Sequence, residues 1–264
     1  VDIMKSNKLQ ELKWTDVKNY LERDDRIIIP VGSTEQHGTW LPLGTDTFTA
    51  ICLAEDAAEK TRVMIAPPIW MGWAPHHLAL PGTINIRAEI LIEFLYDVIN
   101  SLAKHGFKNF ITINGHRIVN LIWMQIAAER AQRQLGVKVV IFDPAYMSKE
   151  IVDKLGFGPV GHADEIEGSE MLYKYPNLVD INKAKDYVPE ETKLYHIDPR
   201  NRSDTLCYVP STEESTKKTG EISGGSVGCP SLASVEKGKE YHDHLVFRLI
   251  EVIEQLKKRD PGKR

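Results

Sequence analysis

The sequence predicts an α/β fold built around a mostly parallel sheet. Short runs of β-branched residues alternate with longer segments that have helical spacing, which is the pattern of repeated β-α-β units. The short runs are almost wholly apolar rather than alternating, as expected for strands covered on both faces. The 264 residues, 42% hydrophobic and 27% charged, suffice for one globular core, and we expect a single domain over residues 1–264.

Four strands account for the short apolar runs. They are placed at Arg26–Val31, 62–66, 109–113 and 137–142. Isoleucine and valine dominate these runs, and polar or glycine-containing segments bound each of them.

Three amphipathic helices are expected between and after the strands. Their apolar positions are Leu91, Leu95, Val98 and Leu102 in the first, Ile118, Leu121, Ile122 and Ile126 in the second, and Leu245, Leu249, Val252 and Leu256 in the third. Gly106 and Gly136 are placed to end the first two helices, because glycine readily adopts the left-handed conformation of a helix C-terminus.

Residues 186–225 depart from this rhythm. The segment is polar and is broken by several prolines and glycines. We expect a loop-rich, irregular region there, which in a compact domain serves as a functional loop, a subunit contact or a mobile segment.

Charge and cysteine content exclude several classes of protein. The 33 Lys and Arg against 37 Asp and Glu give a net charge of −4, which argues against a basic nucleic-acid-binding face. The three cysteines are scattered and form no C-x-x-C pair, so neither a disulfide scaffold nor a thiolate zinc site is expected. No apolar run approaches the ~20 residues of a membrane helix, and no apolar signal segment is present. We therefore expect a cytoplasmic protein without nucleic-acid or membrane partners.

Polar side chains gather where the expected strands end. Open α/β sheets bind ligands at the carboxyl ends of their strands. Glu35, His37 and Asp46 follow the first strand, His116 follows the third, and the segment 161–167 (GHADEIE) follows the fourth. Because Glu35 and His37 are two residues apart, an extended backbone points both side chains the same way. Carboxylates and imidazoles thus meet at one rim of the sheet.

This mixture of oxygen and nitrogen ligands suits Zn²⁺, Mn²⁺, Fe²⁺ or Co²⁺. Glu35, Asp46 and Glu167 would set three negative charges against the four positive charges of two divalent ions. The remaining positive charge would lower the pKa of a bridging water and stabilise an oxyanion. Spacing alone leaves an alternative open, in which Glu35 is a loop residue and Asp46 stabilises the first turn of a helix capped by Thr45.

The segment PVGSTEQHGTWLPLGTD at residues 30–46 strongly resembles the hallmark of the creatininase family, the creatinine amidohydrolases and their relatives. Shorter matches follow in the order of the family's motifs. They are HLALPGT at 77–83, NGH at 114–116, HADEIEGS at 162–169, GCP at 228–230 and ASVEKG at 233–238. The matches span nearly the whole chain, and the region 186–225 is the least similar.

The resemblance implies a three-layer αβα sandwich that holds two divalent ions, Zn, Mn or Fe. Carried over to this sequence, Glu35, Asp46 and His116 hold one ion. His37, Asp46 and a further acidic residue hold the other, so that Asp46 bridges them. The resemblance also implies a small-molecule substrate and a homo-oligomer, often a hexamer.

The chain departs from the creatininases proper two residues after the NGH histidine, where they have a glutamate and this chain has Ile118. We assign the open ligand position to Glu167, which matches the glutamate of the family's E-T-S. Glu165 is the competing candidate and is otherwise counted as catalytic. His162 matches a histidine that shuttles protons in relatives, and its alternative role is a residue at a helix N-terminus bonded to the sheet rim. Loss of the glutamate also leaves open a site with a single ion.

The pocket differs from that of the creatininases as well. Arg117 and Ile118 replace two glycines of the family motif, and a guanidinium offers a planar fork for carbonyl or hydroxyl oxygens of a substrate. The segment GFGPVG at 156–161 lacks the tryptophan with which creatininase closes on its ring substrate, so creatinine itself is not expected. We expect Arg117, His77 and Trp73 to bind the substrate.

The expected function is a metal-dependent hydrolase that opens a small cyclic carbonyl compound by amidohydrolase-type C–N cleavage, with a metal-activated water and His162 as proton donor. One branch of the family offers an alternative: it is thought to hydrolyse a C–C bond of a cyclic polyol diketone, 3-dehydro-scyllo-inosose, in inositol catabolism. A rival from another class is a non-catalytic protein that binds a metal or metabolite on the same fold. A broken ligand set would favour that rival.

Overall fold

Four parallel strands form the centre of the molecule. The computed structural model describes residues 5–190 and 211–256. Its sheet has the order β2-β1-β3-β4, with strands β2 (Met64–Ile65), β1 (Arg26–Val31), β3 (Asn109–Asn114) and β4 (Lys138–Phe142). Ile28 of β1 pairs with Ile65 of β2 and with Ile111 of β3. The expected strands are confirmed, although the edge strand β2 is shorter than its apolar run.

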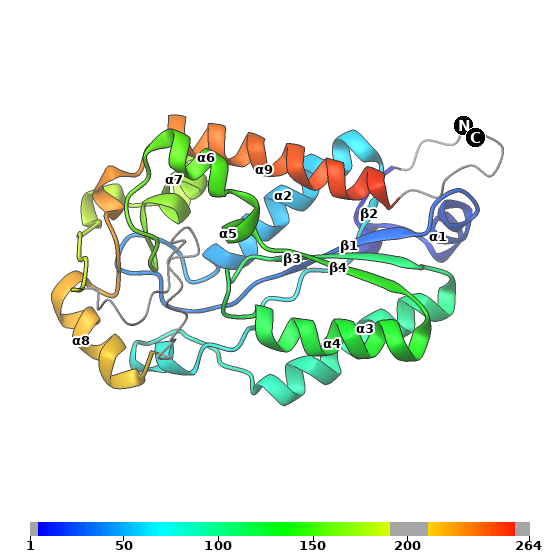
Figure 1. Ribbon diagram of the computed structural model, residues 1–264, viewed down its shortest axis with the longest axis horizontal. Coiled ribbons are helices and arrows are strands. Elements are labelled where there is room, and N and C mark those ends of the chain that lie inside the picture. Colours follow the sequence, from blue (N-terminus) through cyan, green and yellow to red (C-terminus); the bar gives the residue numbers. More distant parts are fainter. Residues whose placement is uncertain (1–4, 191–210, 257–264) are drawn as a thin grey trace.

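Helices cover both faces of this sheet (Figure 1). The helices are α1 (Trp14–Leu21), α2 (Thr45–Thr61), α3 (Ala88–His105), α4 (Leu121–Leu135), α5 (Pro144–Met147), α6 (Lys149–Leu155), α7 (Glu165–Lys174), α8 (Glu213–Ser223) and α9 (Val235–Gln255). In Figure 1, α3 and α4 lie on one side of the strands and α2, α6, α7 and α9 on the other. None of the helices described is both long and apolar enough to cross a bilayer.

Side chains on the two faces of strand β1 pack into two separate hydrophobic cores. Ile27 and Ile29 of β1 pack with residues of α3 and α4, such as Leu95. Ile28, between them, packs on the opposite face with residues of α2 and α9, such as Leu249. Side chains of a strand alternate between its faces, so an all-apolar strand requires cover on both sides. The predicted α/β fold is confirmed as a helix–sheet–helix sandwich.

Helix α4 buries a different stripe from the one its sequence suggested. Ile122 and Ile126 are 62% and 50% exposed, so their assignment to the core is wrong. Trp123, Met124 and Ala127 face the sheet instead. The helix carries two apolar stripes, and its small alanines permit the closer approach to the strands. Gly136 ends the helix with a φ of 63°, as expected.

Part of the region 186–225 is more regular than expected. Residues 213–223 form α8, where the side chain of Thr212 accepts a hydrogen bond from Ser215 N and Gly224 ends the helix in the left-handed conformation. The helix is almost entirely polar, which is why its sequence lacks a clear apolar stripe. Residues 191–210 of the expected irregular region lie outside the described residues.

Candidate metal centre

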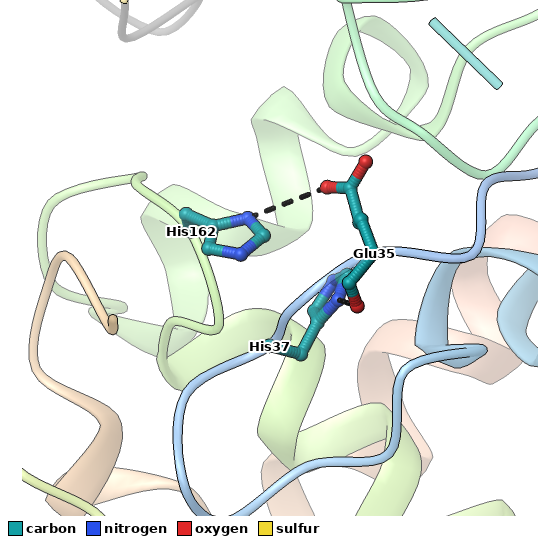
Figure 2. A group of neighbouring side chains, drawn as sticks. All are labelled: Glu35, His37 and His162. Atoms are coloured by element: carbon teal, nitrogen blue, oxygen red, sulfur yellow. Dashed lines mark hydrogen bonds and ion pairs between the residues drawn. The ribbon is translucent and has the colours of Figure 1, made fainter. Parts of the chain in front are cut away.

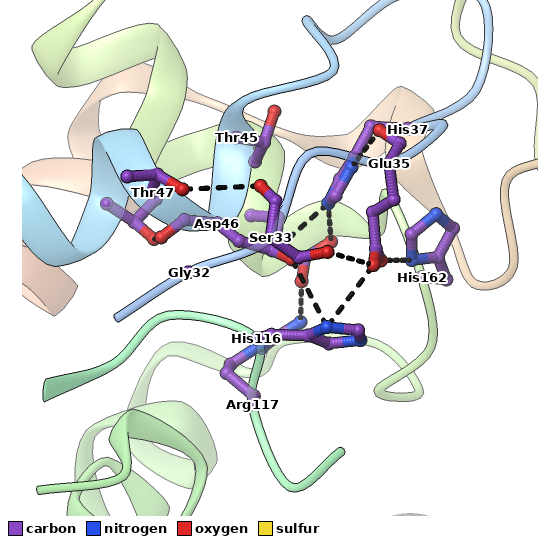
Figure 3. Close-up of polar contacts among 12 residues, drawn as sticks. Gly32, Ser33, Glu35, His37, Thr45, Asp46, Thr47, His116, Arg117 and His162 are labelled. Atoms are coloured by element: carbon purple, nitrogen blue, oxygen red, sulfur yellow. Dashed lines mark hydrogen bonds and ion pairs between the residues drawn. The ribbon is translucent and has the colours of Figure 1, made fainter. Parts of the chain in front are cut away.

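Six polar side chains from several segments meet at the carboxyl ends of β1 and β3, and Figure 3 labels all of them except Glu167. They are Glu35 and His37 after β1, Asp46 in the first turn of α2, His116 after β3, His162 before α7 and Glu167 in the first turn of α7. Parallel strands place the loops that follow them at the same edge of the sheet. Every metal ligand expected from the sequence therefore lies in this one cluster.

The first group of possible ligands consists of Glu35, Asp46 and His116, whose ligand atoms lie within 4.8 Å of one another. His116 Nδ1 is 3.2 Å from Glu35 Oε2 and 3.7 Å from Asp46 Oδ2. All three side chains are buried. This is the set that the resemblance assigned to one ion.

The second group consists of His37, Asp46 and Glu167, with its ligand atoms within the same 4.8 Å. His37 Nε2 is 3.1 Å from Asp46 Oδ1 and 3.8 Å from Glu167 Oε2. Asp46 therefore directs Oδ1 to one group and Oδ2 to the other. A carboxylate with this placement can be shared between two cations.

Unsatisfied polar atoms test whether cations fit this cluster. Within the described residues, five buried atoms of the cluster have no hydrogen-bond partner: Glu35 Oε1, His37 Nε2, Asp46 Oδ2, His116 Nδ1 and Glu167 Oε2. Leaving such groups buried and unpaired is costly, by about 1–3 kcal/mol each and more for charged groups. One atom comes from each predicted ligand. The donor set thus fits divalent ions that accept oxygen and imidazole nitrogen.

The electrostatics of the cluster also favour cations. Burial raises the pKa of Glu35 well above its usual range, and the neighbouring charge of Asp46 raises it further. Burial alone would lower the pKa of His37, but Asp46 and Glu167 outweigh it and raise that pKa to about 10. Three carboxylates compete for too few positive partners, so bound cations would stabilise all three in their ionised form.

A glycine brings the two halves of the first group together. An added Cβ on Gly115 would lie 1.8 Å from the carbonyl oxygen of Asp46. The loop after β3 thus packs directly on the first turn of α2, and only glycine permits this approach. The asparagine-glycine-histidine order of the motif is explained by this contact, which sets His116 beside Asp46.

Arg117 is paired with two carboxylates and also lines a small cavity together with Glu167 and Tyr241. Its Nη2 donates to Glu167 Oε1 at 2.7 Å and to Asp164 Oδ2 at 3.1 Å, and its side chain is 9% exposed. Burial opposes ionisation of Glu167, but Arg117 outweighs it and lowers the Glu167 pKa to about 2. The guanidinium that the sequence assigned to the substrate is engaged by these two carboxylates. Arg117 therefore positions Glu167.

The backbone beside Arg117 has an unusual conformation. Ile118 has a φ of 66°, in the left-handed region that β-branched residues rarely adopt. Its N–H donates to Asp143 Oδ2 at 2.9 Å, which helps to hold the turn. This is the position at which the resemblance implied a metal-binding glutamate, and Glu167 lies in the cluster instead.

The two ring nitrogens of His162 have different partners: Nε2 contacts the backbone of Gln36, and Nδ1 faces Glu35, as Figure 2 shows. Its Nε2 lies 2.6 Å from the carbonyl oxygen of Gln36 and must therefore carry the proton and donate it. Its Nδ1 lies 3.8 Å from Glu35 Oε1 and points into the cluster. Burial and the charge of His37 lower the pKa of His162 to about 3. In the neutral ring, Nδ1 is thus the nitrogen able to accept a proton.

His77 lies against the same carboxylate. Its ring stacks on that of His162 with centroids 4.1 Å apart, and its Nε2 is 3.3 Å from Glu35 Oε1. Its Nδ1 lies 3.0 Å from the side-chain nitrogen of Gln36. His77, expected to bind substrate, is therefore in the cluster and buried.

Two expected site residues lie elsewhere. Glu165 accepts hydrogen bonds from the ammonium of Lys237 and from Gly158 N, and is buried in that pairing. Residues two apart on a helix point about 200° away from each other, so Glu165 and Glu167 diverge. Trp73 is half-buried and packs against the core beneath α3 and α4. The geometry favours Glu167 over Glu165 for the open ligand position.

Sequence reasoning missed the residues that hold the ligands in place. Ser33 Oγ donates to Glu35 Oε2 at 2.8 Å. Asp164 caps α7 by accepting from the backbone N–H groups of Ile166 and Glu167, and also accepts from Arg117. An aspartate three residues before a glutamate at the start of a helix is a recognisable capping signal, which would have identified Asp164.

Known proteins resemble this chain over almost its full length. The family model described as creatininase, creatinine amidohydrolase, matches residues 10–253. The 3-dehydro-scyllo-inosose hydrolase of Thermotoga maritima is 32% identical over 271 residues, covering 96% of this chain and 84% of that protein. The creatinine amidohydrolase of Pseudomonas putida is 26% identical over 233 residues, covering 80% and 89%.

Solved structures agree with this assignment. A structure described as "Creatininase Mn" superposes with a TM-score of 0.80 at 23% identity and covers 97% of this chain and 100% of its own. At that identity the match establishes the shared fold. The sequence motifs, the helix–sheet–helix architecture and the family match over residues 10–253 all agree. The chain is a hydrolase and belongs to the creatininase family.

Proposed function

We propose that the chain is a metal-dependent hydrolase of small cyclic carbonyl compounds that uses two divalent ions. Glu35, Asp46 and His116 would hold one ion, and His37, Asp46 and Glu167 the other. One observation carries the proposal: Asp46 directs one oxygen to each group, and each of the five ligands has a buried atom without a hydrogen-bond partner among the described residues. The manganese form of creatininase supports ions of this class.

The reaction begins with addition of water to a carbonyl carbon, after which a bond from that carbon breaks and the leaving atom takes a proton. Bound divalent ions supply a water of lowered pKa and stabilise negative charge on the carbonyl oxygen. Arg117 holds Glu167 so that Oε2 faces His37 while Oε1 accepts from the guanidinium. Ser33 holds Glu35 in the same way. The ligand carboxylates are thus fixed before substrate arrives.

His162 is placed to carry the proton, and a bound substrate or ions would have to raise its pKa from about 3 for it to act near neutral pH. Its Nε2–H is fixed by the Gln36 carbonyl, so Nδ1 can accept a proton from the attacking water and release it to the leaving atom. His77 stacks on the ring and limits its rotation. General acid–base catalysis of this kind contributes about 10²–10⁴-fold.

The bond that breaks is either C–N, in a cyclic amide, or C–C, in a cyclic polyol diketone. Both reactions share the first step and the proton transfer. The 32% identity with the Thermotoga maritima 3-dehydro-scyllo-inosose hydrolase, over 96% of this chain, supports the C–C alternative. Arg117 does not bear on the choice, because its guanidinium is bound to Glu167 and Asp164.

The alternatives with fewer ions or none have little support in the ligand set. Ile118 is the one departure from the family's ligands, and Glu167 lies 3.8 Å from His37, where it can complete the second group. A non-catalytic metal-binding protein would show a broken set.

A substrate panel tests the proposal. Protein reconstituted with Mn²⁺ is assayed with creatinine, other small lactams, a formamide and an oxidised inosose, with products identified by mass spectrometry. We expect one compound to gain one water and open its ring, with a carboxylate and a new N–H group on the product for C–N cleavage, and a carboxylate and a new C–H bond for C–C cleavage. Glu35→Gln is expected to abolish this turnover. Equal rates in the metal-free chain, or full turnover by Glu35→Gln, would contradict the proposal.

We also propose a homo-oligomer, with a hexamer as the family expectation. Helices α3 and α4 expose large apolar side chains, among them Phe94, Ile122 and Ile126. Exposed apolar surface of this kind is typical of subunit contacts. Sedimentation velocity tests the proposal, and a monomer at micromolar concentration would contradict it.

A further inference from the structure

A second cluster of metal-ligating side chains lies further along the helices that carry Asp46 and Glu167. It consists of Cys52 on α2, Glu170 on α7 and His242 on α9. Cys52 Sγ is 3.8 Å from His242 Nδ1 and 4.0 Å from Glu170 Oε1, and the last two atoms are 3.0 Å apart. The three residues are 1%, 4% and 0% exposed. They come from three helices that pack on one another.

The spacing of these atoms matches a tetrahedral ion. Zinc binds sulfur at about 2.3 Å and nitrogen or oxygen at about 2.0–2.1 Å, so its ligand atoms lie about 3.3–3.6 Å apart. The three distances in the cluster bracket these values, and shifts of a few tenths of an ångström would suffice. Of the three residues, Glu170 also lines a small cavity, which it shares with Thr49, Arg117, Glu167 and Tyr241.

The surroundings of His242 are those of a metal ligand. Its other nitrogen, Nε2, lies 2.8 Å from Asp56 Oδ2, which also accepts from Lys174 Nζ at 2.6 Å. Histidines that bind metals nearly always donate their second ring N–H to a carboxylate or carbonyl, which fixes the ring and raises its basicity. Asp56 provides that contact.

Carboxylates surround the imidazole of the cluster. Glu170 and Asp56 both contact His242, and Asp56 also contacts the ammonium of Lys174. A cation at this position would lie beside acidic side chains, and buried charges are tolerated only where they are paired in this way.

The same three types of residue also occur in cysteine nucleophile sites, but the burial excludes that role. A reactive cysteine needs an accessible thiolate, whereas Cys52 is fully enclosed and burial raises the pKa of its thiol.

We propose that Cys52, Glu170 and His242 bind one thiophilic divalent cation, such as Zn²⁺ or Co²⁺, as a structural site separate from the catalytic pair. The ion would tie α2 and α7 to α9 and so fix the two helices whose first turns present Asp46 and Glu167. This site stands apart from the proposed function, because none of its ligands belongs to the catalytic cluster.

Cobalt spectroscopy tests the site, because thiolate binding to Co²⁺ gives a charge-transfer band in the near ultraviolet that oxygen and nitrogen ligands do not give. We expect the metal-free wild type to develop this band as Co²⁺ is added. The band should saturate when one Co²⁺ per chain is bound at the cysteine site. Asp46→Asn should keep the band although it disrupts the catalytic pair. Cys52→Ala should lose it, while Cys229→Ala and Cys207→Ala should keep it.

Two outcomes overturn the proposal: no band in the wild type, or a band that persists in Cys52→Ala. The wild-type measurement does not depend on any variant folding. His242→Gln offers a second variant in which the thiol is retained, and it should weaken Co²⁺ binding by at least ~10-fold. Unchanged binding in a folded His242→Gln protein would also contradict the site.

Discussion

Helices α2 and α7 each contribute to two clusters that differ in what they leave unsatisfied. At their first turns, Asp46 and Glu167 have buried oxygens without hydrogen-bond partners among the described residues. Further along the same helices, Glu170 pairs with His242, which pairs in turn with Asp56. The first cluster leaves buried polar atoms unpaired, whereas in the second both ring nitrogens of His242 face a carboxylate. The comparison teaches that two sets of similar ligands can differ in how much a bound cation would add, and we expect a cation to matter more at the first.

The largest effect is expected from the residue shared by the two catalytic groups. Asp46→Asn removes the charge that faces both His37 and His116, so we expect turnover to fall by about 10³-fold or more. Metal analysis should show loss of the catalytic ions, with the helical circular dichroism retained. Glu55→Gln, on the exposed side of the same helix, is the matched control. Full activity in Asp46→Asn would remove the distinction between the clusters.

Removal of the proton carrier should act on chemistry alone. His162→Gln is expected to lower kcat by about 10²-fold or more, because Nδ1 is lost while the ligands remain. Metal content should equal that of the wild type. His105→Gln, at the exposed end of α3, provides the control. A loss of ions in His162→Gln would instead make His162 a ligand.

Replacement of Arg117 should act mainly on the stability of the fold. Arg117→Met leaves the buried carboxylates of Glu167 and Asp164 without their cation, and we expect a loss of about 3–5 kcal/mol in the free energy of unfolding of the metal-free protein. Arg133→Met removes an exposed ion pair with Glu129 and should cost about 0–1 kcal/mol. Urea unfolding of both variants measures the difference. Equal losses would show that Arg117 does not hold Glu167.

The smallest effect is expected from the second cluster. Zn²⁺ added beyond the catalytic requirement should raise the stability of the wild type by mass action, by about 2.7 kcal/mol at a free concentration 100 times the Kd. Cys52→Ala should lack this additional rise while it retains turnover with Mn²⁺. Thermal unfolding at increasing Zn²⁺ concentrations measures this rise in stability for both proteins. An identical rise in Cys52→Ala would contradict the structural site.

Much of the fold and of the first cluster was predictable. The strand Arg26–Val31 was predictable because burial on both faces makes every residue after Arg26 apolar. The side chains of the first cluster were predictable as neighbours because short motifs place them at strand ends, where topology brings them together. The buried face of α4 was not predictable, because Ile122 and Trp123 are both apolar. Which of them faces the sheet depends on how closely the helix can approach it.

Long-range pairing explains what the sequence did not predict. The contacts of Arg117 with Glu167 and Asp164 join residues about 50 positions apart that no local motif links. Cys52 and His242 are separated by 190 residues and share no motif. The second cluster exists only because α2, α7 and α9 pack together, and local sequence carries no sign of that contact.

Metal content per chain after reconstitution with Mn²⁺ tests the central claim most directly, when measured together with turnover for the wild type and Asp46→Asn. Manganese prefers oxygen and nitrogen ligands, so it reports the catalytic cluster rather than the cysteine site. We predict two ions per wild-type chain, and loss of both ions and of turnover in Asp46→Asn. A variant that keeps two ions and its activity would show that Asp46 does not join two metal sites, and would contradict the account.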